Sequence, residues 1–273
     1  MKIIVDNGGS KSDWLILPLN EIFSFDGINF FKNPQELNNE FKKIINHLNI
    51  GKEKVILDFY TAGFSQSLAL SHKFMIEKEM SNIKINFYSD MLLASKSSFN
   101  DNQSGISCIL GTGSNCAYYD GKKNNIITPS LGYIFSDEGS GYDLGRRLLN
   151  MFFNDKLNSN INSDIQNHAK TPKNELLNKI YKLENPKKFI STFSFVVKKN
   201  EKNALIDNLI KKSFISFLHN HPFTHPDFRR YKFGFIGSVA FNFRKQLEFV
   251  MNDENLNFEI IQSPIKKLSN DLK

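Results

Sequence analysis

Apolar residues in the first hundred positions form short strand-like runs and one clearly helical stretch. Runs at residues 2–5, 14–17 and 21–25 are separated by a glycine-rich turn and by Pro18–Asn20, which is typical of three consecutive β-strands. After Pro34 the apolar residues recur at the spacing of one buried helical face, which predicts a helix. These residues are Leu37, Phe41, Ile44, Ile45 and Leu48. Runs at 55–60 and 83–88 then predict buried strands, and 68–80 and 91–99 predict helices.

The same plan begins again after a polar break at residues 100–104. Strands are expected at 106–110, 116–119 and 125–128, with helices at 143–154 and, less regularly, over 164–218. A strand at 233–236, a helix at 241–250 and a strand at 258–261 follow. This order predicts two α/β domains with mixed sheets and a ligand-binding cleft between them. We expect the domains to span 1–104 and 105–273, with a last helix that could pack back on the first domain.

The composition predicts a globular protein of the cytoplasm. The chain is 40% hydrophobic with 26 Phe, enough to fill a sizeable core. Its first residues do not resemble a signal peptide, and no apolar stretch approaches the roughly 18 residues needed to span a bilayer, so no membrane partner is expected. Cys108 and Cys116 lack the spacing of metal ligands and are expected to be reduced thiols.

The net charge of +7 raises the question of nucleic-acid binding. Lysines are scattered among Asn, Asp and Glu, and arginine occurs at only five positions, so no basic cluster forms. The sequence therefore predicts no nucleic-acid partner.

The segment from Asp6 to Asp13 carries the first candidate chemistry. Gly8 and Gly9 allow the backbone to come close to a ligand. After them the Lys11 ammonium stands between the hydroxyls of Ser10 and Ser12. These groups suit a polyphosphate with magnesium. A Walker loop does not fit, because Ser10 stands where it needs glycine and a strand, not a helix, follows. A plain hairpin turn remains the alternative.

A second turn has the same character in the second half. Gly111, Thr112, Gly113 and Ser114 stand between two predicted strands, at the place that corresponds to the first turn. Two such hairpins facing each other could hold phosphates from both sides.

Three further segments have a functional and a structural interpretation. Asp90 ends a strand and opens a helix, so it is either an N-cap or a general base. Asp137 and Glu138 lie between glycines ahead of a helix, and could contact sugar hydroxyls or a hydrated cation, or only cap that helix. Gly237 and Ser238, between a strand and a helix, allow a planar ligand to approach closely, or make a tight turn.

In this order the segments resemble the BadF/BadG/BcrA/BcrD-type ATPase family, and within it the N-acetylglucosamine kinases, over most of the chain. Residues 6–14 resemble its first phosphate motif, 110–115 its second, and 235–240 its adenosine motif. The resemblance implies two actin-like ATPase (RNase H-like) domains of the actin and hexokinase superfamily. It also implies an enzyme that uses ATP and Mg²⁺ to phosphorylate N-acetylglucosamine or a related amino sugar, at the 6-hydroxyl.

The resemblance also implies a role for individual residues. Asp90 matches the catalytic acid that accepts the proton of the sugar hydroxyl, and Asp6 would hold magnesium through water. ATP would contact Asp6, Gly8, Gly9, Ser10, Lys11, Ser12, Gly111, Thr112, Gly113, Ser114, Gly237 and Ser238. The sugar would contact Asn29, Asn115, Cys116 and Asp137. Leu131 stands where some members carry an aromatic residue, and Ser10 and Ser12 replace the more usual threonines.

Other functions remain as alternatives. Glucosamine or N-acetylmuramic acid could be the substrate, and a non-catalytic ATP or sugar sensor is the alternative of another class, although binding alone would not need Asp90. The family branch that activates dehydratases needs a cysteine-ligated cluster, and the zinc-containing sugar kinase and repressor family needs a cysteine-rich motif; this chain has neither. His219, His221 and His225 are expected to lie in a surface loop rather than to bind metal, because Pro222 and Pro226 interrupt them. A homodimer is compatible with the family.

Overall fold

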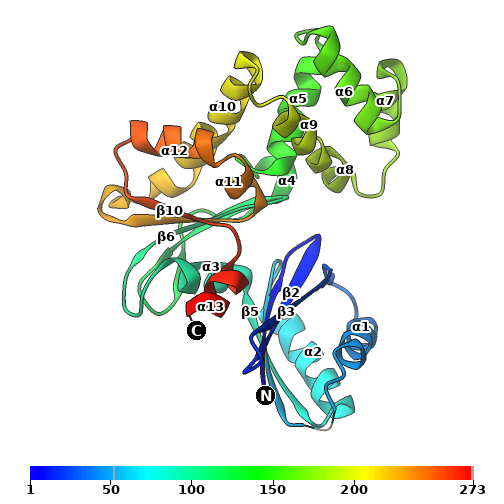
Figure 1. The fold of residues 1–273 in the computed structure, drawn as a ribbon, viewed down its shortest axis with the longest axis vertical. Helices are drawn as coiled ribbons and strands as arrows, with labels where there is room; N and C mark the ends of the chain where they lie inside the picture. The colour runs from blue at the N-terminus through cyan, green and yellow to red at the C-terminus, as the bar shows by residue number, and fades with distance from the viewer. Residues whose placement is uncertain (52, 272–273) are drawn as a thin grey trace. The chain divides into compact units, whose positions relative to one another are not determined.

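The computed structural model describes residues 1–51 and 53–271, which form two compact units (Figure 1). The N-terminal unit consists of Met1–Ser97 together with residues 263–271, and the C-terminal unit is Ser98–Gln262. Within the described residues each unit is built on a mixed sheet of five strands with helices packed against it. The predicted α/β class is therefore confirmed. The last two residues of the predicted second domain lie outside the described range.

The N-terminal sheet has the strand order β3-β2-β1-β4-β5. Strands β1 (Lys2–Asn7), β2 (Lys11–Leu17) and β3 (Glu21–Asp26) are antiparallel neighbours, whereas β4 (Val55–Thr61) and β5 (Ile83–Ser89) run parallel to β1. Asn7 pairs with Thr61, and Thr61 pairs with Ser89. The carboxyl ends of these three parallel strands therefore share one edge of the sheet, where ligand sites of α/β folds commonly form.

Helices cover both faces of this sheet. On one face α1 (Pro34–His47) and α2 (Gln66–Glu79) pack over Ile3, Val5 and Trp14. On the other, α3 (Asp90–Ser98) and α13 (Pro264–Asp271) pack over Leu15. A sheet buried on both faces needs apolar residues at successive positions, which explains the nearly continuous apolar runs in the sequence.

Helix α1 begins where the sequence predicts it. Pro34 occupies the first turn, where its missing N–H is not needed, and the Asn33 side chain accepts a hydrogen bond from the Glu36 backbone N–H at 2.9 Å. Phe41 points into the core and meets Trp14 edge-on at 5.7 Å between ring centroids.

The C-terminal sheet repeats the hairpin plan in the order β10-β9-β6-β7-β8. Strands β6 (Gly105–Leu110), β7 (Ser114–Tyr119) and β8 (Asn124–Ile126) are antiparallel. Strand β9 (Lys232–Ile236) is parallel to β6, and β10 (Phe258–Ile261) is parallel to β9. The last strand of the meander was expected to reach Thr128 but ends at Ile126, so Thr128 lies in the segment beyond it.

Helices pack on this sheet around a core that includes Phe214, Phe217, Phe233 and Phe235. Their bounds are α4 (Gly132–Phe135), α5 (Gly141–Phe153), α6 (Ser159–Ala169), α7 (Lys173–Tyr181), α8 (Pro186–Thr192), α9 (Ser194–Lys199), α10 (Ala204–Asn220), α11 (Ser238–Asn242) and α12 (Arg244–Asp253), with 3-10 turns at Pro222–Thr224 and Phe228–Arg230. The single helix predicted over 241–250 is wrong, because the chain breaks at buried Phe243 and forms α11 and α12. In the part of the chain that the structure describes, no helix combines the length and apolar character needed to cross a membrane.

Candidate active site

The turn between β1 and β2 is open. The Gly8 N–H donates to the Lys11 carbonyl oxygen at 2.9 Å and closes the hairpin, while Gly9 and Ser10 are exposed. A Cβ added at Gly9 would meet no atom within 4 Å. The backbone of this turn is therefore accessible to a ligand.

Hydrogen bonds of buried Asn7 to the loop after β3 support the turn. The Asn7 amide donates to the Ile28 carbonyl oxygen at 2.9 Å and to Thr61 Oγ1 at 3.0 Å, and its Oδ1 accepts the Ile28 N–H at 2.8 Å. A Cβ at Gly27 would stand 2.4 Å from the Gly8 carbonyl oxygen, so only glycine fits there. Sequence reasoning missed Asn7, although a polar residue between a buried strand and two glycines is a usable signal. The predicted sugar contact Asn29 lies exposed in this supported loop.

The other predicted phosphate ligands of this hairpin differ in orientation. Ser12 is fully buried, donates to the Asp26 carbonyl oxygen at 3.1 Å and accepts the Trp14 indole N–H at 3.1 Å. Lys11 has an exposed ammonium 2.8 Å from Asp13. Thus Gly9, Ser10 and Lys11 are exposed at the turn, whereas the Gly8 N–H and the Ser12 hydroxyl are already engaged in the fold.

Two carboxyl groups lie at the shared strand edge beside this turn. Desolvation raises the pKa of Asp6 to about 7, with further contributions from Asp90 and Asp13 against the opposing effect of Lys11. Desolvation also raises the pKa of Asp90, although the Met91 N–H, which donates to its Oδ1 at 2.8 Å, acts in the opposite direction. One ammonium among three carboxylates leaves this edge with an excess of negative charge, and perturbed carboxyls of this kind are typical of functional sites.

The donor set of this edge fits a magnesium ion held mainly by water and phosphate. Mg²⁺ prefers oxygen ligands and commonly uses only one or two carboxylates together with substrate phosphates. Among residues 1–51 and 53–271, no three His, Cys, Asp or Glu side chains converge as ligands of a fully protein-bound metal. Asp6 is half-buried and its charge is poorly compensated, so a nearby cation would stabilise its ionised form.

The turn between β6 and β7 is fixed by the helix that follows it. The Gly111 N–H donates to the Gly113 carbonyl oxygen at 2.9 Å. The first N–H groups of α5 reach the same turn, from Gly141 to the Gly111 carbonyl oxygen at 2.8 Å and from Tyr142 to that of Thr112 at 3.2 Å. The second hairpin is therefore held rigidly at its backbone.

Asp137 adds a second restraint on this turn. It is 3% exposed with φ +71°, and its Oδ1 accepts the Ser114 N–H at 3.0 Å. The ammonium of Lys187, from α8, lies 2.8 Å from its Oδ2. A Cβ at Gly113 would stand 2.9 to 3.0 Å from these carboxylate and ammonium groups. Sequence reasoning singled out Asp137 but missed Lys187, which comes from a helix far along the chain.

Gly237 of the predicted adenosine motif lies against the same turn. Gly237 has φ +109°, and a Cβ there would stand 2.5 Å from the Leu110 carbonyl oxygen. Glycine is therefore required by both conformation and space. Ser238 begins α11 and is exposed.

The two predicted sugar contacts on β7 differ in availability. Asn115 is half-buried, and its Oδ1 accepts the Cys116 N–H at 2.9 Å. The Cys116 side chain belongs to the hydrophobic core, and burial raises its thiol pKa to about 12. Burial also raises the pKa of the Cys108 thiol well above its ordinary value. Both thiols are neutral, so Cys116 can offer a ligand its backbone but not a thiolate.

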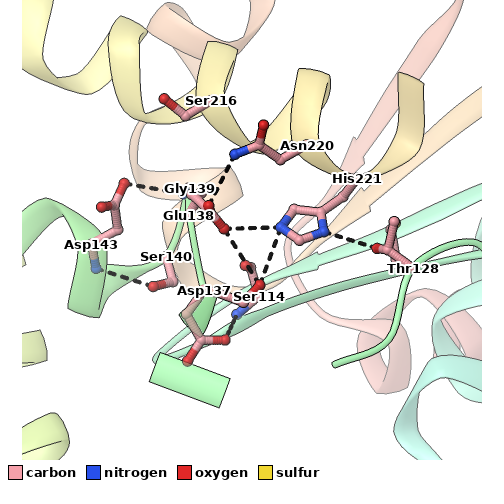
Figure 2. A network of polar contacts seen from close by, with 12 residues as sticks. Ser114, Thr128, Asp137, Glu138, Gly139, Ser140, Asp143, Ser216, Asn220 and His221 are labelled. Carbon is pink, nitrogen blue, oxygen red and sulfur yellow. Dashed lines mark hydrogen bonds and ion pairs between the residues drawn. The ribbon is translucent and has the colours of Figure 1, made fainter. Parts of the chain in front are cut away.

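A histidine network holds the segment that carries Asp137 (Figure 2). His221 Nε2 lies 2.9 Å from Glu138 Oε2, and its Nδ1 lies 2.8 Å from Thr128 Oγ1. The Asn220 amide donates to Glu138 Oε1 at 3.0 Å. Burial acts to raise the pKa of Glu138, but the hydrogen bonds from His221 and Asn220 outweigh it and lower the pKa.

The three histidines that were expected in a surface loop have separate environments. His221 is half-buried in this network, His219 packs on Phe223, and His225 packs on Tyr118. The structure therefore places only His221 next to the candidate site.

The two acids after Ser136 do not cap helix α5. Its N-cap is Ser140, whose hydroxyl accepts the Asp143 N–H at 3.1 Å. Asp137 pairs instead with Lys187. Glu138 pairs with His221 (Figure 2). The capping interpretation of this pair is wrong, because the hydroxyl nearest the helix takes that role.

Comparison with known proteins identifies the fold. No protein-family model and no curated protein matches the chain. Among solved structures, a candidate N-acetylglucosamine kinase from Porphyromonas gingivalis aligns with a TM-score of 0.91 and 26% identity over 99% of this chain and 98% of that one. A candidate N-acetylglucosamine kinase from Chromobacterium violaceum aligns with a TM-score of 0.66 and 14% identity, over 100% of this chain and 98% of that one. A ROK family glucokinase from Streptomyces griseus, in complex with glucose and AMPPNP, aligns with a TM-score of 0.55 and 12% identity, over 99% of this chain and 98% of that one.

These similarities define the class of the molecule. Its two α/β units have the fold of actin-like ATPases and sugar kinases, as the sequence predicted. At 26% identity, the Porphyromonas gingivalis protein shares this fold over nearly the full length of both chains.

Proposed function

We propose that this protein is an ATP-dependent sugar kinase of the BadF/BadG/BcrA/BcrD type that phosphorylates N-acetylglucosamine or a related amino sugar, at the 6-hydroxyl. The observation that carries the proposal is the edge of the N-terminal sheet, where desolvated Asp90 lies near Asp6 beside an open glycine turn. The assignment of the Porphyromonas gingivalis protein as a candidate N-acetylglucosamine kinase supports it.

Each hairpin is proposed to offer groups to the nucleotide. In the first, the exposed backbone of Gly9 and Ser10 and the exposed Lys11 ammonium, which pairs with Asp13, are proposed to contact phosphate oxygens. In the second, residues 111–114 form a turn whose backbone is already ordered, so binding costs little conformational entropy. Gly237 lies against that turn, and Gly237 and Ser238 are proposed to contact the adenosine.

Asp90 acts as the general base. It accepts the proton of the sugar hydroxyl as that oxygen attacks the γ-phosphorus of ATP. Desolvation moves its pKa toward neutral pH, which makes it a better proton acceptor than an ordinary aspartate. The hydrogen bond from the Met91 N–H fixes its orientation.

Asp6 attracts the cation that accompanies ATP. Bound Mg²⁺ would neutralise charge on the phosphates, and Asp6 would hold it through water. Its raised pKa reflects desolvation first and then the negative charges of Asp90 and Asp13, which such a cation would offset.

The sugar is proposed to contact Asn29, Asn115, Asp137 and the backbone at Cys116. Amides and a carboxylate suit hydroxyl and acetamido groups. Glucosamine and N-acetylmuramic acid are the alternative substrates. The cytoplasmic location, the homodimer and the lack of a nucleic-acid partner stay predictions from the sequence.

An ATP-consumption screen tests the proposal. The protein is incubated with ATP and MgCl₂ and, separately, with N-acetylglucosamine, glucosamine, N-acetylmuramic acid and glucose, and both ADP and sugar phosphate are measured. We expect equal amounts of ADP and sugar phosphate with an amino sugar, and neither product when EDTA replaces magnesium. Nucleotide binding without turnover on any sugar would contradict the kinase and favour the sensor.

A further inference from the structure

The second hairpin carries a buried carboxylate that the proposed ATP binding does not explain. Asp137 is 3% exposed and lies directly against Gly113 and Ser114, which are proposed to bind phosphate. A carboxylate at this position repels phosphate oxygens, and the repulsion is poorly screened where water is excluded. Something must offset this charge if the hairpin is to accept a polyphosphate.

The ammonium of Lys187 lies where it can do so. It is 2.8 Å from Asp137 Oδ2, whereas the Ser114 N–H donates to the other oxygen, Oδ1. A Cβ added at Gly113 would stand 3.0 Å from this nitrogen, so the ammonium also touches the turn itself. It lies 5.9 Å from the centre of the Tyr133 ring, a further contact that favours a cation.

The other acids of this segment, Glu138 and Asp143, have their own partners. Buried Asp143 accepts hydrogen bonds from Arg146 and Arg147, both at 2.8 Å. Glu138 is bound by His221 on the far side of the segment (Figure 2). Among the ion pairs of the described residues, Asp137 is joined to Lys187 alone.

Helix α8 does not depend on Lys187 for its position. It packs against α5 through Gly145, where an added Cβ would stand 2.0 Å from the Ile190 carbonyl oxygen. Phe189 and Ile190 add apolar contacts to the core of the C-terminal unit. A change at Lys187 therefore alters the charge at the hairpin while α8 stays packed.

We propose that Lys187 is the charge-compensating residue of the second hairpin: its ammonium neutralises Asp137, so that this turn accepts the polyphosphate of a nucleotide. The inference rests on the proposed function, since it takes ATP as the ligand. Lys187 is a positioning residue here, because it acts on phosphate through the charge of Asp137.

Equilibrium binding of ATP without sugar, followed by calorimetry, tests the inference. Lys187→Met should weaken ATP binding by about tenfold or more, and Lys187→Arg should keep it within about threefold of the wild type. Lys188→Met, at an exposed neighbour on the same helix, removes the same net charge and should change affinity by less than about twofold. The double variant Lys187→Met with Asp137→Asn removes both charges, and should return ATP affinity to within about threefold of the wild type.

The outcomes separate this inference from the proposed function. A wild type that binds no ATP contradicts the kinase. A wild type that binds ATP, with unchanged affinity in Lys187→Met, overturns only the role of Lys187. A double variant that binds as weakly as Lys187→Met overturns charge compensation, because the ammonium would then act on phosphate directly. If Lys187→Met does not fold, the double variant and Lys187→Arg still decide, since neither leaves Asp137 ionised and unpaired.

Discussion

The two hairpins share one plan but differ in rigidity and in charge. The first turn is open at Gly9, and its neighbouring acids share a single ammonium. Desolvation, together with these neighbouring acids, raises the pKa of Asp6 to about 7. The second turn is fixed by the first N–H groups of α5, and its one acid, Asp137, has its own partner in Lys187.

This difference suggests a division of work within the proposed kinase. An edge with excess negative charge favours a cation and a proton acceptor, which are the needs of phosphoryl transfer. A rigid turn with balanced charge favours a polyanion without requiring a metal of its own. Substitutions that exchange these properties should therefore have opposite effects in the two units.

The largest effect is expected from Asp90→Asn. The amide can still accept the Met91 N–H but cannot accept a proton, so kcat should fall by about 10²- to 10⁴-fold. ATP affinity should stay within about threefold of the wild type. In the other unit, Asp137→Asn should mainly raise KM for the sugar, because that carboxylate is proposed to contact sugar rather than to move a proton. Both variants are checked by steady-state kinetics with the sugar found in the screen and by ATP calorimetry. Undiminished turnover in Asp90→Asn would show that Asp90 is not the general base.

The fold was predictable from the sequence where local patterns determine it. The apolar run from Val55 and the periodic face after Pro34 each gave one element at nearly its observed bounds, because both depend on residues close in the chain. The break at Phe243 was not predictable in this way. The apolar period continues across it, and only packing in the core separates α11 from α12.

The residues of the candidate site were likewise predictable only where a local signal marks them. Glycine turns and the strand-end Asp90 are local signals, so sequence reasoning found them. Lys187 lies in a lysine pair that looks like a solvated helix end, and His221 lies in a stretch that looks like a loop. Lys187 reaches Asp137, and His221 reaches Glu138, only when distant helices pack. Nothing local in the sequence therefore marks either contact.

A smaller effect is expected when the same substitution is made in the two turns. Gly113→Ala would force its Cβ against the Asp137 carboxylate and the Lys187 ammonium, which should reduce the free energy of unfolding by about 1–3 kcal/mol. In Gly9→Ala the added Cβ meets no atom within 4 Å, so the free energy of unfolding should change by less than about 0.5 kcal/mol, or rise slightly. Urea denaturation of both variants measures the difference. Equal losses at the two positions would contradict the view that the first turn is open and the second is fixed.

The smallest effect concerns the charge of Asp6. Because its pKa is higher in the folded protein than the ordinary value of 3.8, the folded state loses stability as the pH rises from about 4 to about 7. Asp6→Asn removes this loss, so above pH 7 it should be more stable than the wild type by on the order of 1 kcal/mol, and the gain should fade as the pH falls toward 4. Asp137→Asn, which breaks the ion pair with Lys187, should lower stability at pH 8 instead. Urea denaturation from pH 5 to 8 compares the two variants, and a loss of stability in Asp6→Asn at pH 8 would mean that the first hairpin compensates its acids as fully as the second.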